Sequence, residues 1–378
     1  MSQTGVLLTG GTGFVGMQVL ARYLERTDRT VYALVRAEDR EAAEERLRER
    51  LSAVTDPEAV GERLVAVPGD VEAPGLGLSR SDRERLVAHV GPVIHAAASV
   101  SFELPLDESR RINVEGTRNV IDFALRCGRL ERLAYISTAY VAGDHDEEFG
   151  EDDLEVGQEF RNAYEQSKYE AERLVRSHAH DLPIQIFRPS IIVGEAESGW
   201  TDSFNVLYTP LRAFVRGHMP FVPADPGSPV DVVSVDYVAD AVFELVHRPL
   251  EGLETYHLVA GPEATTVDEI IGLASRQLDH GRPLVVPPSL YRRLMHPLIL
   301  WRSEGRREKA LRRLEAFFPY FSMRVRYRNE RTRRLLEPEG IRVTPFRSYF
   351  GRLIDFAQQA DWGRRQLSRW DVRAAAPA

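Results

Sequence analysis

The strongest chemical signal in the sequence is a tyrosine followed four residues later by a lysine, in Tyr164-Glu165-Gln166-Ser167-Lys168. On a helix this spacing places both side chains on one face, so the ammonium can stabilise a phenolate and lower the tyrosine pKa from its reference of about 10. Lys168 and Lys309 are the only two lysines in the chain, which makes chance a poor explanation of the pairing. The pattern predicts an acid/base tyrosine with a lysine partner.

A second hydroxyl group precedes this helix. Ser137-Thr138 ends an apolar run that starts at Leu133 and has the composition of a strand. At a strand end, the Thr138 hydroxyl can donate to the same carbonyl oxygen as the tyrosine, which completes an oxyanion-binding set. We therefore predict that Thr138, Tyr164 and Lys168 are the catalytic residues.

A glycine-rich turn follows the first strand expected in the chain. The segment Gly10-Gly11-Thr12-Gly13-Phe14-Val15-Gly16 places glycines at positions 10, 13 and 16. Gly10 and Gly13 permit a tight turn and a close approach of a pyrophosphate to a helix N-terminus, while Gly16 lets helix and strand pack closely. Because this pattern lies between a strand and a helix, it predicts a dinucleotide site.

The second strand ends in Leu34-Val35-Arg36-Ala37, which bears on the choice of cofactor. A ribose 2′-phosphate is recognised by a cation at this point, whereas a free 2′-hydroxyl is recognised by an acid. Arg36 is therefore expected to bind the phosphate of NADP(H), with Arg46 as a second contact. Glu38 and Asp39 follow closely, and an acid reaching the ribose would weaken this interpretation.

Residues after the third and fourth strands are also candidates for the cofactor site. Asp70 follows the third strand and is positioned to meet the adenine edge, although it could be a simple turn aspartate. After His95 the run Ala96-Ala97-Ala98 would let ribose and phosphates lie against the backbone, and plain packing is the alternative.

The distribution of apolar residues predicts an α/β fold. Strand-like and helical runs alternate through the first 190 residues, which is typical of a doubly wound parallel sheet of the Rossmann type. We expect a cofactor domain over residues 1–190, with return segments at about 229–260. A smaller, discontinuous, mainly helical substrate and C-terminal region would comprise 191–228 and 261–378. The expected strands are 6–9, 31–35, 64–68, 92–95, 133–137, 184–187 and 256–259, and the expected helix starts are Gly13, Asp39, Ser81, Glu108, Asn162 and a capping box at Thr266 and Glu269. Helical periodicity is also expected over residues 289–321 and 348–365.

Composition narrows the function classes. The net charge of −8 argues against a nucleic-acid-binding protein. A single cysteine, Cys127, and the lack of a His-x-x-x-His pair argue against a metal site, and we expect this thiol to be buried and inert. No apolar run reaches the roughly 18 residues of a membrane span, and no signal peptide is recognised. We expect a cytoplasmic protein, with peripheral membrane association left open.

Charge is concentrated in two segments. Residues 290–334 contain 14 Arg and Lys against 4 Glu, and residues 144–159 contain nine acids. The basic segment could dock an acyl-carrier protein, lie on an anionic membrane or receive coenzyme A phosphates, or it could be a helix with its arginines in water. For the acidic segment we favour a solvated loop over a lid. The basic segment interleaves Arg292, Arg293, Arg302, Arg306, Arg307, Arg312 and Arg313 with Leu294, Leu298, Ile299, Leu300, Trp301, Leu311, Leu314, Phe317 and Phe318.

Together these motifs resemble the extended short-chain dehydrogenase/reductase superfamily, over roughly residues 5 to 260. The marks are the glycine turn from Thr9 to Gly16, the Tyr164-x-x-x-Lys168 pair and Arg188-Pro189. Within the superfamily the chain looks most like fatty acyl-CoA reductases and thioester reductase domains. That likeness rests on Leu34 to Ala37, His95 to Phe102, Asn113 to Thr117, Arg188 to Ile192 and Gly199 to Asp202.

The resemblance implies further site residues. It places cofactor contacts at Thr12, Gly13, Phe14, Val15, Arg36, Asp70, Val71, Ala97, Tyr164, Lys168, Pro189 and Ser190, and it matches Thr138, Tyr164 and Lys168 to the catalytic positions. The sequence has no adenylation domain and no carrier domain. We therefore expect either that an already activated acyl group is supplied from elsewhere or that the protein acts on another carbonyl.

Three functions compete at this point. The leading hypothesis is NADPH-dependent reduction of an acyl thioester to an aldehyde, and on to an alcohol in a second step. The alternative is a dehydrogenase of alcohols or hydroxysteroids, or a nucleotide-sugar epimerase or reductase, because the same triad serves both. A noncatalytic NADP-sensing scaffold is disfavoured because Tyr164 and Lys168 are both present. The sequence does not indicate an oligomeric state.

Overall fold

The computed structural model describes residues 4–55, 58–217, 219, 221–291, 293, 317–370 and 372. Its centre is a seven-stranded parallel sheet in the order β3-β2-β1-β4-β5-β7-β12. The strand order reverses between β1 and β4, which is where the ligand crevice of a doubly wound sheet lies. The strands are β1 (Gly5–Thr9), β2 (Val31–Val35), β3 (Leu64–Pro68), β4 (Val90–His95), β5 (Arg132–Ile136), β7 (Ile184–Pro189) and β12 (Leu253–Leu258).

The register of the sheet aligns the residues that end its central strands. Thr9 of β1 pairs with His95 of β4, His95 pairs with Tyr135 of β5, and Tyr135 pairs with Ile186 of β7. These strands are buried on both faces, so they are apolar almost throughout instead of alternating with polar residues. The loops that follow them therefore emerge at one edge.

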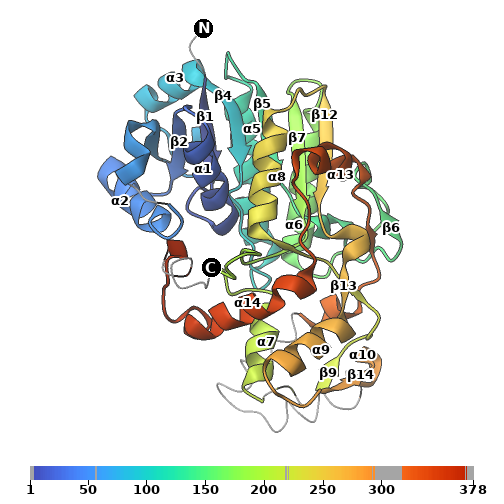
Figure 1. Ribbon diagram of the computed structural model, residues 1–378. Helices are drawn as coiled ribbons and strands as arrows, with labels where there is room; N and C mark the ends of the chain where they lie inside the picture. Colours follow the sequence, from blue (N-terminus) through green and yellow to red (C-terminus); the bar gives the residue numbers. More distant parts are fainter. Residues whose placement is uncertain are drawn as a thin grey trace.

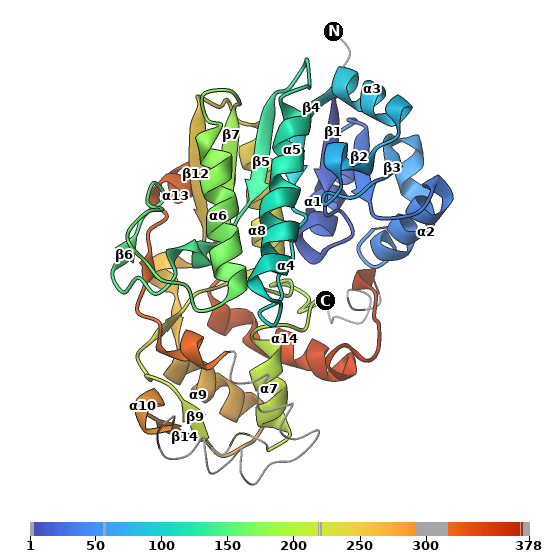
Figure 2. The same ribbon diagram turned by 180° about the vertical axis from the view of Figure 1, so that it is seen from behind.

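Helices cover both faces of this sheet. In Figure 1, α1 and α8 lie on the near face, and Figure 2 shows α5 and α6 on the opposite face. Two of the expected helix starts prove to be capping residues, since Asp39 caps α2 and Asn162 caps α6. The helices that flank the sheet are α1 (Phe14–Arg26), α2 (Arg40–Leu51), α3 (Arg80–His89), α4 (Leu106–Arg110), α5 (Gly116–Ala124), α6 (Ala163–Ser177), α8 (Val235–His247) and α13 (Glu330–Leu336).

A second group of elements lies beyond the carboxyl ends of the strands, in the lower part of Figure 1. It has its own apolar core, which includes Leu207, Phe214, Ile271 and Phe350. Four short two-stranded pairs belong to this group or link it to the sheet: β6 (Glu148–Phe149) with β15 (Arg326–Tyr327), β8 (Ile191–Val193) with β11 (Val232–Ser234), β9 (Phe221–Pro223) with β14 (Leu284–Val286), and β10 (Pro229–Val230) with β13 (Thr265–Thr266). The helices of this group are α7 (Tyr208–Val215), α9 (Val267–Gln277), α10 (Pro288–Leu290) and α14 (Phe346–Gln359).

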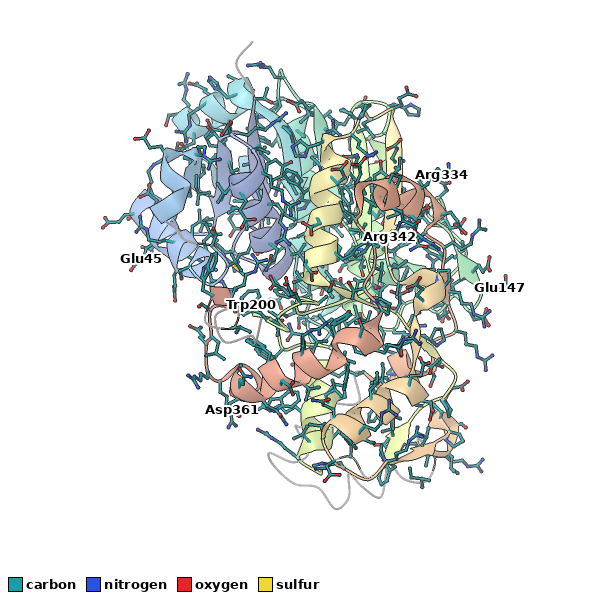
Figure 3. All side chains as sticks on the ribbon, in the orientation of Figure 1. Glu45, Glu147, Trp200, Arg334, Arg342 and Asp361 are labelled. Carbon is teal, nitrogen blue, oxygen red and sulfur yellow. The ribbon has the colours of Figure 1, made fainter. Side chains whose placement is uncertain are left out.

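Trp200 joins the two groups of elements. Figure 3 shows it beside α14, and it has no solvent-exposed surface. Its Nε1 atom donates to the carbonyl oxygen of Leu367 at 2.9 Å, and its ring lies 6.4 Å from the ring of Phe14, at the start of α1. The Arg369 amide in turn donates to the carbonyl oxygen of Ala53 at 2.8 Å. The segment after α14 therefore crosses back onto the part of the molecule that contains the glycine turn.

The expected strands are all present, with shifts of up to three residues at their ends. The capping box at Thr266 and Glu269 is also confirmed. The expected helix over 348–365 ends earlier, at Gln359, and a turn follows at Asp361–Gly363 (η9). Most of the helical run expected from 289 to 321 lies outside the described residues. No helix in the described part of the chain is long and apolar enough to cross a membrane.

Candidate active site

The glycine turn packs against the residues that follow β4. Gly10 has a φ of +74°, and a Cβ atom there would lie 2.6 Å from the backbone of Ala96 and Ala97. A Cβ on Gly16 would lie 2.1 Å from the carbonyl oxygen of Gly10. Both positions therefore require glycine, because any side chain would push the turn away from the edge of the sheet. The turn leads into α1, whose N-cap is Gly13.

A cleft runs from this turn across the sheet edge. Its wall contains most of the residues expected to bind a cofactor, which come from the ends of four different strands. They are Gly10, Thr12, Gly13, Arg36, Arg46, Asp70, Val71, Ala96, Ala97 and Ala98. The glycine turn, and a wall that extends over the residues that follow β1, β2, β3 and β4, fit an extended dinucleotide.

The other expected cofactor residues lie outside this wall. Phe14 packs on Trp200, Val15 is partly buried in the core, and Gly16 packs on the turn itself. Pro189 is the last residue of β7 and Ser190 follows it, and the Pro189 carbonyl oxygen accepts a 3.5 Å hydrogen bond from the Thr138 hydroxyl. Their positions are at the far side of the edge, near the expected catalytic residues.

The charged groups at the end of β2 are arranged around Arg36. Its guanidinium is 67% exposed and makes a 3.5 Å contact with Glu72. Arg46 donates to the Arg36 carbonyl oxygen at 2.8 Å, so both arginines lie at one end of the cleft. The carboxylate of Asp39 accepts from the Ala42 amide at 2.9 Å as the cap of α2. That capping role leaves Glu38 as the nearby exposed acid.

A buried polar chain joins the turn to α5. Thr9 Oγ1 lies 2.7 Å from His95 Nδ1, and His95 Nε2 lies 3.0 Å from Thr117 Oγ1. The Ala97 amide donates to the same Thr9 hydroxyl at 3.3 Å. Burial, reinforced by the positive charge of Lys168, lowers the pKa of His95 to about 3. His95 is therefore a neutral scaffold residue that fixes the backbone on which the three alanines lie.

Thr138 and Tyr164 meet at the end of β5. Thr138 begins the turn Ala139–Ala142 (η4) and accepts from the Tyr140 amide at 3.3 Å, while its hydroxyl is hydrogen-bonded to the Tyr164 phenol. Burial raises the pKa of Tyr164 to about 12, despite this hydrogen bond, and the Glu165 carboxylate adds to the increase. Our expectation of a lowered tyrosine pKa was therefore wrong for this structure. The phenol is neutral and can donate a proton.

Lys168 is held by the sheet. Its Nζ atom donates to the Ile136 carbonyl oxygen at 2.8 Å and lies 4.3 Å from the centre of the Tyr135 ring. Burial lowers the pKa of Lys168 to about 7, although the Glu172 carboxylate opposes this change. An ammonium has three donors, so the bond to Ile136 leaves capacity for cofactor hydroxyl groups.

Asn113 is one of the residues on which the family resemblance rests, but the sequence suggested no role for it. Its side chain accepts from the Ser99 amide at 2.8 Å and donates both to the Ser99 carbonyl oxygen and to Ser167 Oγ. Ser167 then donates to the Tyr164 carbonyl oxygen at 3.1 Å. Asn113 thus fixes the loop after β4 to the turn of α6 that carries the tyrosine.

Arg188 is the centre of a buried ion-pair cluster behind Thr138. It has no exposed surface and approaches Glu172 to 2.6 Å. Glu172 also accepts from Ser137 Oγ at 2.7 Å and from Arg176 at 3.0 Å. Burial alone would raise the pKa of Glu172, but the two guanidinium groups and Ser137 lower it to about 2. The cluster fixes the end of β5 relative to α6 and β7.

Buried residues anchor the acidic segment 144–159 to the rest of the protein. We expected a solvated loop and did not expect this anchoring. Phe149 is fully buried, and Glu151 accepts from the Thr332 amide and hydroxyl at 3.0 and 2.5 Å. Its strand β6 pairs with β15, and Arg331 contacts Asp152 at 2.8 Å. Part of the basic segment thus pairs with the acidic one, and Figure 3 shows Glu147 and Arg334 on the same side of the molecule.

Other residues of the basic segment, namely Arg292 and residues 294–316, lie outside the described residues. In the part that is described, no group of His, Cys, Asp and Glu side chains could hold a metal ion. Cys127 is buried against the Phe123 carbonyl oxygen, and burial raises its pKa to about 12.

Aromatic side chains that sequence reasoning missed line the far side of Tyr164. Phe102 lies 5.6 Å from the Tyr164 ring and stacks on Tyr320 at 5.3 Å. The Tyr320 hydroxyl donates to the Glu165 carboxylate at 2.6 Å and accepts from Asn162 at 2.6 Å. Tyr320 is 155 residues away from Glu165 in the sequence, so no local pattern could have linked the two. This contact brings the C-terminal part of the chain to the catalytic helix.

A family model, curated relatives and a solved structure are similar to this chain. The model of the family described as "Male sterility protein" matches residues 8–242. The chain is 32% identical over 276 residues to the nonribosomal peptide synthetase asaC of Aspergillus flavus, an alignment that covers 68% of this chain and 26% of the synthetase. It is 29% identical over 279 residues to the fatty acyl-CoA reductase wat of Drosophila melanogaster, which covers 63% of this chain and 53% of that protein.

The chain therefore spans about a quarter of the synthetase and about half of the fly reductase. A solved structure of similar length is the terminal R domain from the myxalamid PKS-NRPS biosynthetic pathway. It superposes with a TM-score of 0.83 at 28% identity, and the match covers 97% of this chain and 94% of that domain. The likeness to this structure thus extends beyond the matched family model into the C-terminal third.

Proposed function

Because the chain belongs to the Male sterility protein family of extended short-chain dehydrogenases/reductases, we propose that it is an NADPH-dependent reductase of acyl thioesters. The substrate would be an acyl group on coenzyme A or on a carrier protein. The product would be an aldehyde, with further reduction to an alcohol. The observation that carries it is the Thr138, Tyr164 and Lys168 constellation at the end of β5, beside a dinucleotide-shaped cleft.

The cofactor would be held along the cleft. The glycine turn offers backbone amides at the start of α1 for a pyrophosphate, and Ala96 to Ala98 offer a flat backbone surface. Arg36 and Arg46 lie where a 2′-phosphate would extend, which supports NADP(H) over NAD(H). Lys168, with donors left over from its bond to Ile136, would bind ribose hydroxyls. The bound nicotinamide supplies the hydride.

The protein groups act on the oxygen of the substrate carbonyl. The Thr138 hydroxyl and the Tyr164 phenol would donate hydrogen bonds to this oxygen, and these bonds strengthen as negative charge develops on it. A neutral Tyr164, whose pKa is raised to about 12, then holds a proton for the alkoxide form. Loss of the thiol from the tetrahedral product gives the aldehyde.

The relatives favour this chemistry over that of an alcohol dehydrogenase or epimerase. One relative is named a fatty acyl-CoA reductase, and the solved structure is named the terminal R domain of a PKS-NRPS biosynthetic pathway. The relatives also suggest carrier-bound acyl groups as substrates, and the remaining basic residues of the 290–334 segment are candidates for contacts with an acidic carrier.

Incubation of the protein with NADPH and a panel of acyl-CoAs, an acyl-carrier thioester, a hydroxysteroid and a nucleotide sugar tests the proposal. Expected products, detected by mass spectrometry, are aldehyde or alcohol and free thiol from the thioesters only. Turnover of the steroid or sugar nucleotide without turnover of any thioester would overturn the proposal.

A further inference from the structure

A residue from a distant part of the chain completes the N-terminal cap of α6, the helix that carries Tyr164. Asn162 is the N-cap, and its Oδ1 atom accepts from the Glu165 amide at 3.0 Å. Its Nδ2 atom donates to the Tyr320 hydroxyl at 2.6 Å, and this hydroxyl donates to the Glu165 carboxylate, also at 2.6 Å. The three hydrogen bonds form a closed circuit. The turn that carries Tyr164 is therefore capped by Asn162 and Tyr320 together.

The carboxylate that accepts from Tyr320 is fully buried. Glu165 has no exposed surface, and its Oε2 atom accepts from the Arg161 amide at 3.0 Å and lies 3.5 Å from the Arg161 guanidinium. Among the described residues, the Tyr320 hydroxyl is the only donor to Oε1. A buried carboxylate oxygen without a donor is costly, so loss of this hydroxyl would favour a rearranged first turn.

The ring of Tyr320 reaches the Tyr164 side chain through Phe102. The rings of Phe102 and Tyr320 stack at 5.3 Å with 14° between their planes, and Phe102 lies 5.6 Å from the Tyr164 ring. Tyr320 also meets the Tyr140 ring edge-on at 5.1 Å, and the Tyr140 amide donates to the Thr138 hydroxyl. Tyr320 thus contacts neighbours of both groups that would donate to the substrate oxygen.

The Tyr320 hydroxyl itself has no hydrogen left for a substrate. A tyrosine hydroxyl donates one hydrogen bond, and that of Tyr320 goes to Glu165. Its effect on the reaction would therefore pass through the residues that it contacts, and not through the substrate oxygen.

On these contacts, and resting on the proposed function, we infer that Tyr320 is a positioning residue for Tyr164. Its hydroxyl fixes the first turn of α6, and its ring holds Phe102 against the phenol. Tyr320 belongs to the turn Phe318–Ser322 (η7), in the basic C-terminal segment. The geometry of proton donation therefore depends on how this segment packs on α6.

Tyr320→Phe tests the inference because it removes only the hydroxyl. We expect kcat for the best thioester substrate to fall about tenfold, since a small displacement of a reacting group is costly. The Kd for NADPH, measured by fluorescence titration, should change less than twofold. A kcat within twofold of the unsubstituted value in the folded variant, or an equal loss of NADPH affinity, would overturn the inference.

Tyr327→Phe is the matched control. Tyr327 lies in the same C-terminal segment and is as buried as Tyr320, with 5% of its surface exposed in each case. Its hydroxyl has no hydrogen-bond partner in the described part of the chain. The substitution should therefore leave kcat within twofold. An equal fall in both variants would show that the effect does not depend on the contact with the cap.

Phe102→Leu tests the ring contact separately. Phe102 is partly exposed, so this substitution should be tolerated by the fold, and it leaves the cap of α6 intact. We expect kcat to fall about fivefold because the phenol loses the ring that packs on it. An unchanged kcat would contradict the role of the ring.

A double-mutant cycle shows whether the hydroxyl acts through Glu165. Tyr320→Phe should lower kcat about tenfold in the unsubstituted protein but less than threefold in Glu165→Ala, because the acceptor is already absent. Effects that simply multiply would overturn the proposed route from Tyr320 to Tyr164.

Hydrogen exchange makes the test independent of turnover. The Glu165 amide is held by Asn162, so Tyr320→Phe should accelerate exchange in peptides that cover residues 162–168 at least fivefold, whereas Tyr327→Phe should not. Unchanged exchange in folded Tyr320→Phe would show that the first turn does not depend on the hydroxyl. Absence of reduction with every thioester would contradict the proposed function, and the exchange rates would still decide whether Tyr320 positions this turn.

Discussion

The Nζ atom of Lys168 donates to the carbonyl oxygen of Ile136, the last residue of β5, at 2.8 Å. The lysine is therefore placed by the edge of the sheet, although it was recognised by its spacing from Tyr164. In the proposed mechanism the two residues of this motif have separable roles: Lys168 would bind the cofactor, and Tyr164 would donate to the substrate carbonyl oxygen.

Tyr164→Phe should lower kcat by about 10²-fold or more, because one positioned proton donor is removed. Binding of NADPH, measured by fluorescence titration, should remain nearly unchanged. Lys168→Ala should impair both binding and turnover, which makes it the informative comparison. Near-normal turnover of Tyr164→Phe would remove the central element of the proposed mechanism.

Arg36→Ala should weaken NADPH binding by about 1.5 to 3 kcal/mol, since one charge-assisted contact with the 2′-phosphate is lost. Binding of NADH should be almost unaffected. Arg80→Ala is a suitable control, because Arg80 is 92% exposed and pairs with Glu84 on α3, outside the cleft wall. Equal loss of both cofactors would show that Arg36 supports the fold of the β2 end and does not read the phosphate.

Glu172→Gln should destabilise the protein by about 3 to 5 kcal/mol, because Arg188 would remain buried without its carboxylate partner. The folded-state pKa of Glu172 is lowered to about 2 from a usual 4.5. Its stabilising contribution is therefore complete above pH 4.5 and is lost as the pH falls toward 2. Urea denaturation at pH 7 measures the loss, with the exposed pair variant Glu155→Gln as control. A similar loss in both variants would contradict the central role of the buried cluster.

Two buried histidines predict a separate acid sensitivity. The pKa values of His95 and His257 are lowered to about 3, mainly by burial, whereas both side chains titrate near 6.5 when unfolded. Between pH 6.5 and 4.5 the unfolded chain therefore binds protons that the folded chain does not bind. Stability should fall by up to about 1.4 kcal/mol per pH unit for each histidine.

The measurement is the free energy of unfolding as a function of pH across that window. His95→Gln and His257→Gln should each reduce the slope by the contribution of one proton, even if they also lower stability overall. His180→Gln is the control, since His180 is exposed. An unchanged slope in both buried variants would show that other groups govern the acid transition.

The sheet was predictable because each of its strands is a short apolar run bounded by Gly, Pro or polar residues, as at Val31–Val35 and Leu64–Pro68. The cofactor wall was predictable for a related reason. In a parallel sheet all strand ends point to one edge, so residues that directly follow strands, such as Arg36, Asp70 and Ala97, must come together.

Contacts that join distant segments were not predictable. Tyr320 reaches Glu165 across 155 positions, and Glu151 meets Thr332 across 181. Tyr320 and Glu151 lie in no recognisable sequence motif. The charge of the acidic and basic segments suggested only that both segments are exposed. The raised pKa of Tyr164 was missed because the spacing of a motif indicates which charge is near, but not how much water is removed.

The path of the chain after α14 limits how this enzyme could be re-engineered. Trp200 is hydrogen-bonded to Leu367, and Arg369 to Ala53. The segment after α14 therefore connects regions that are far apart in the sequence. In a chimaera made at a single junction, with the C-terminal half taken from a relative, these hydrogen bonds would lose one of their native partners. Transfer of substrate preference would require grafting the loop around Trp200, the α7 to α9 region and the tail as one set.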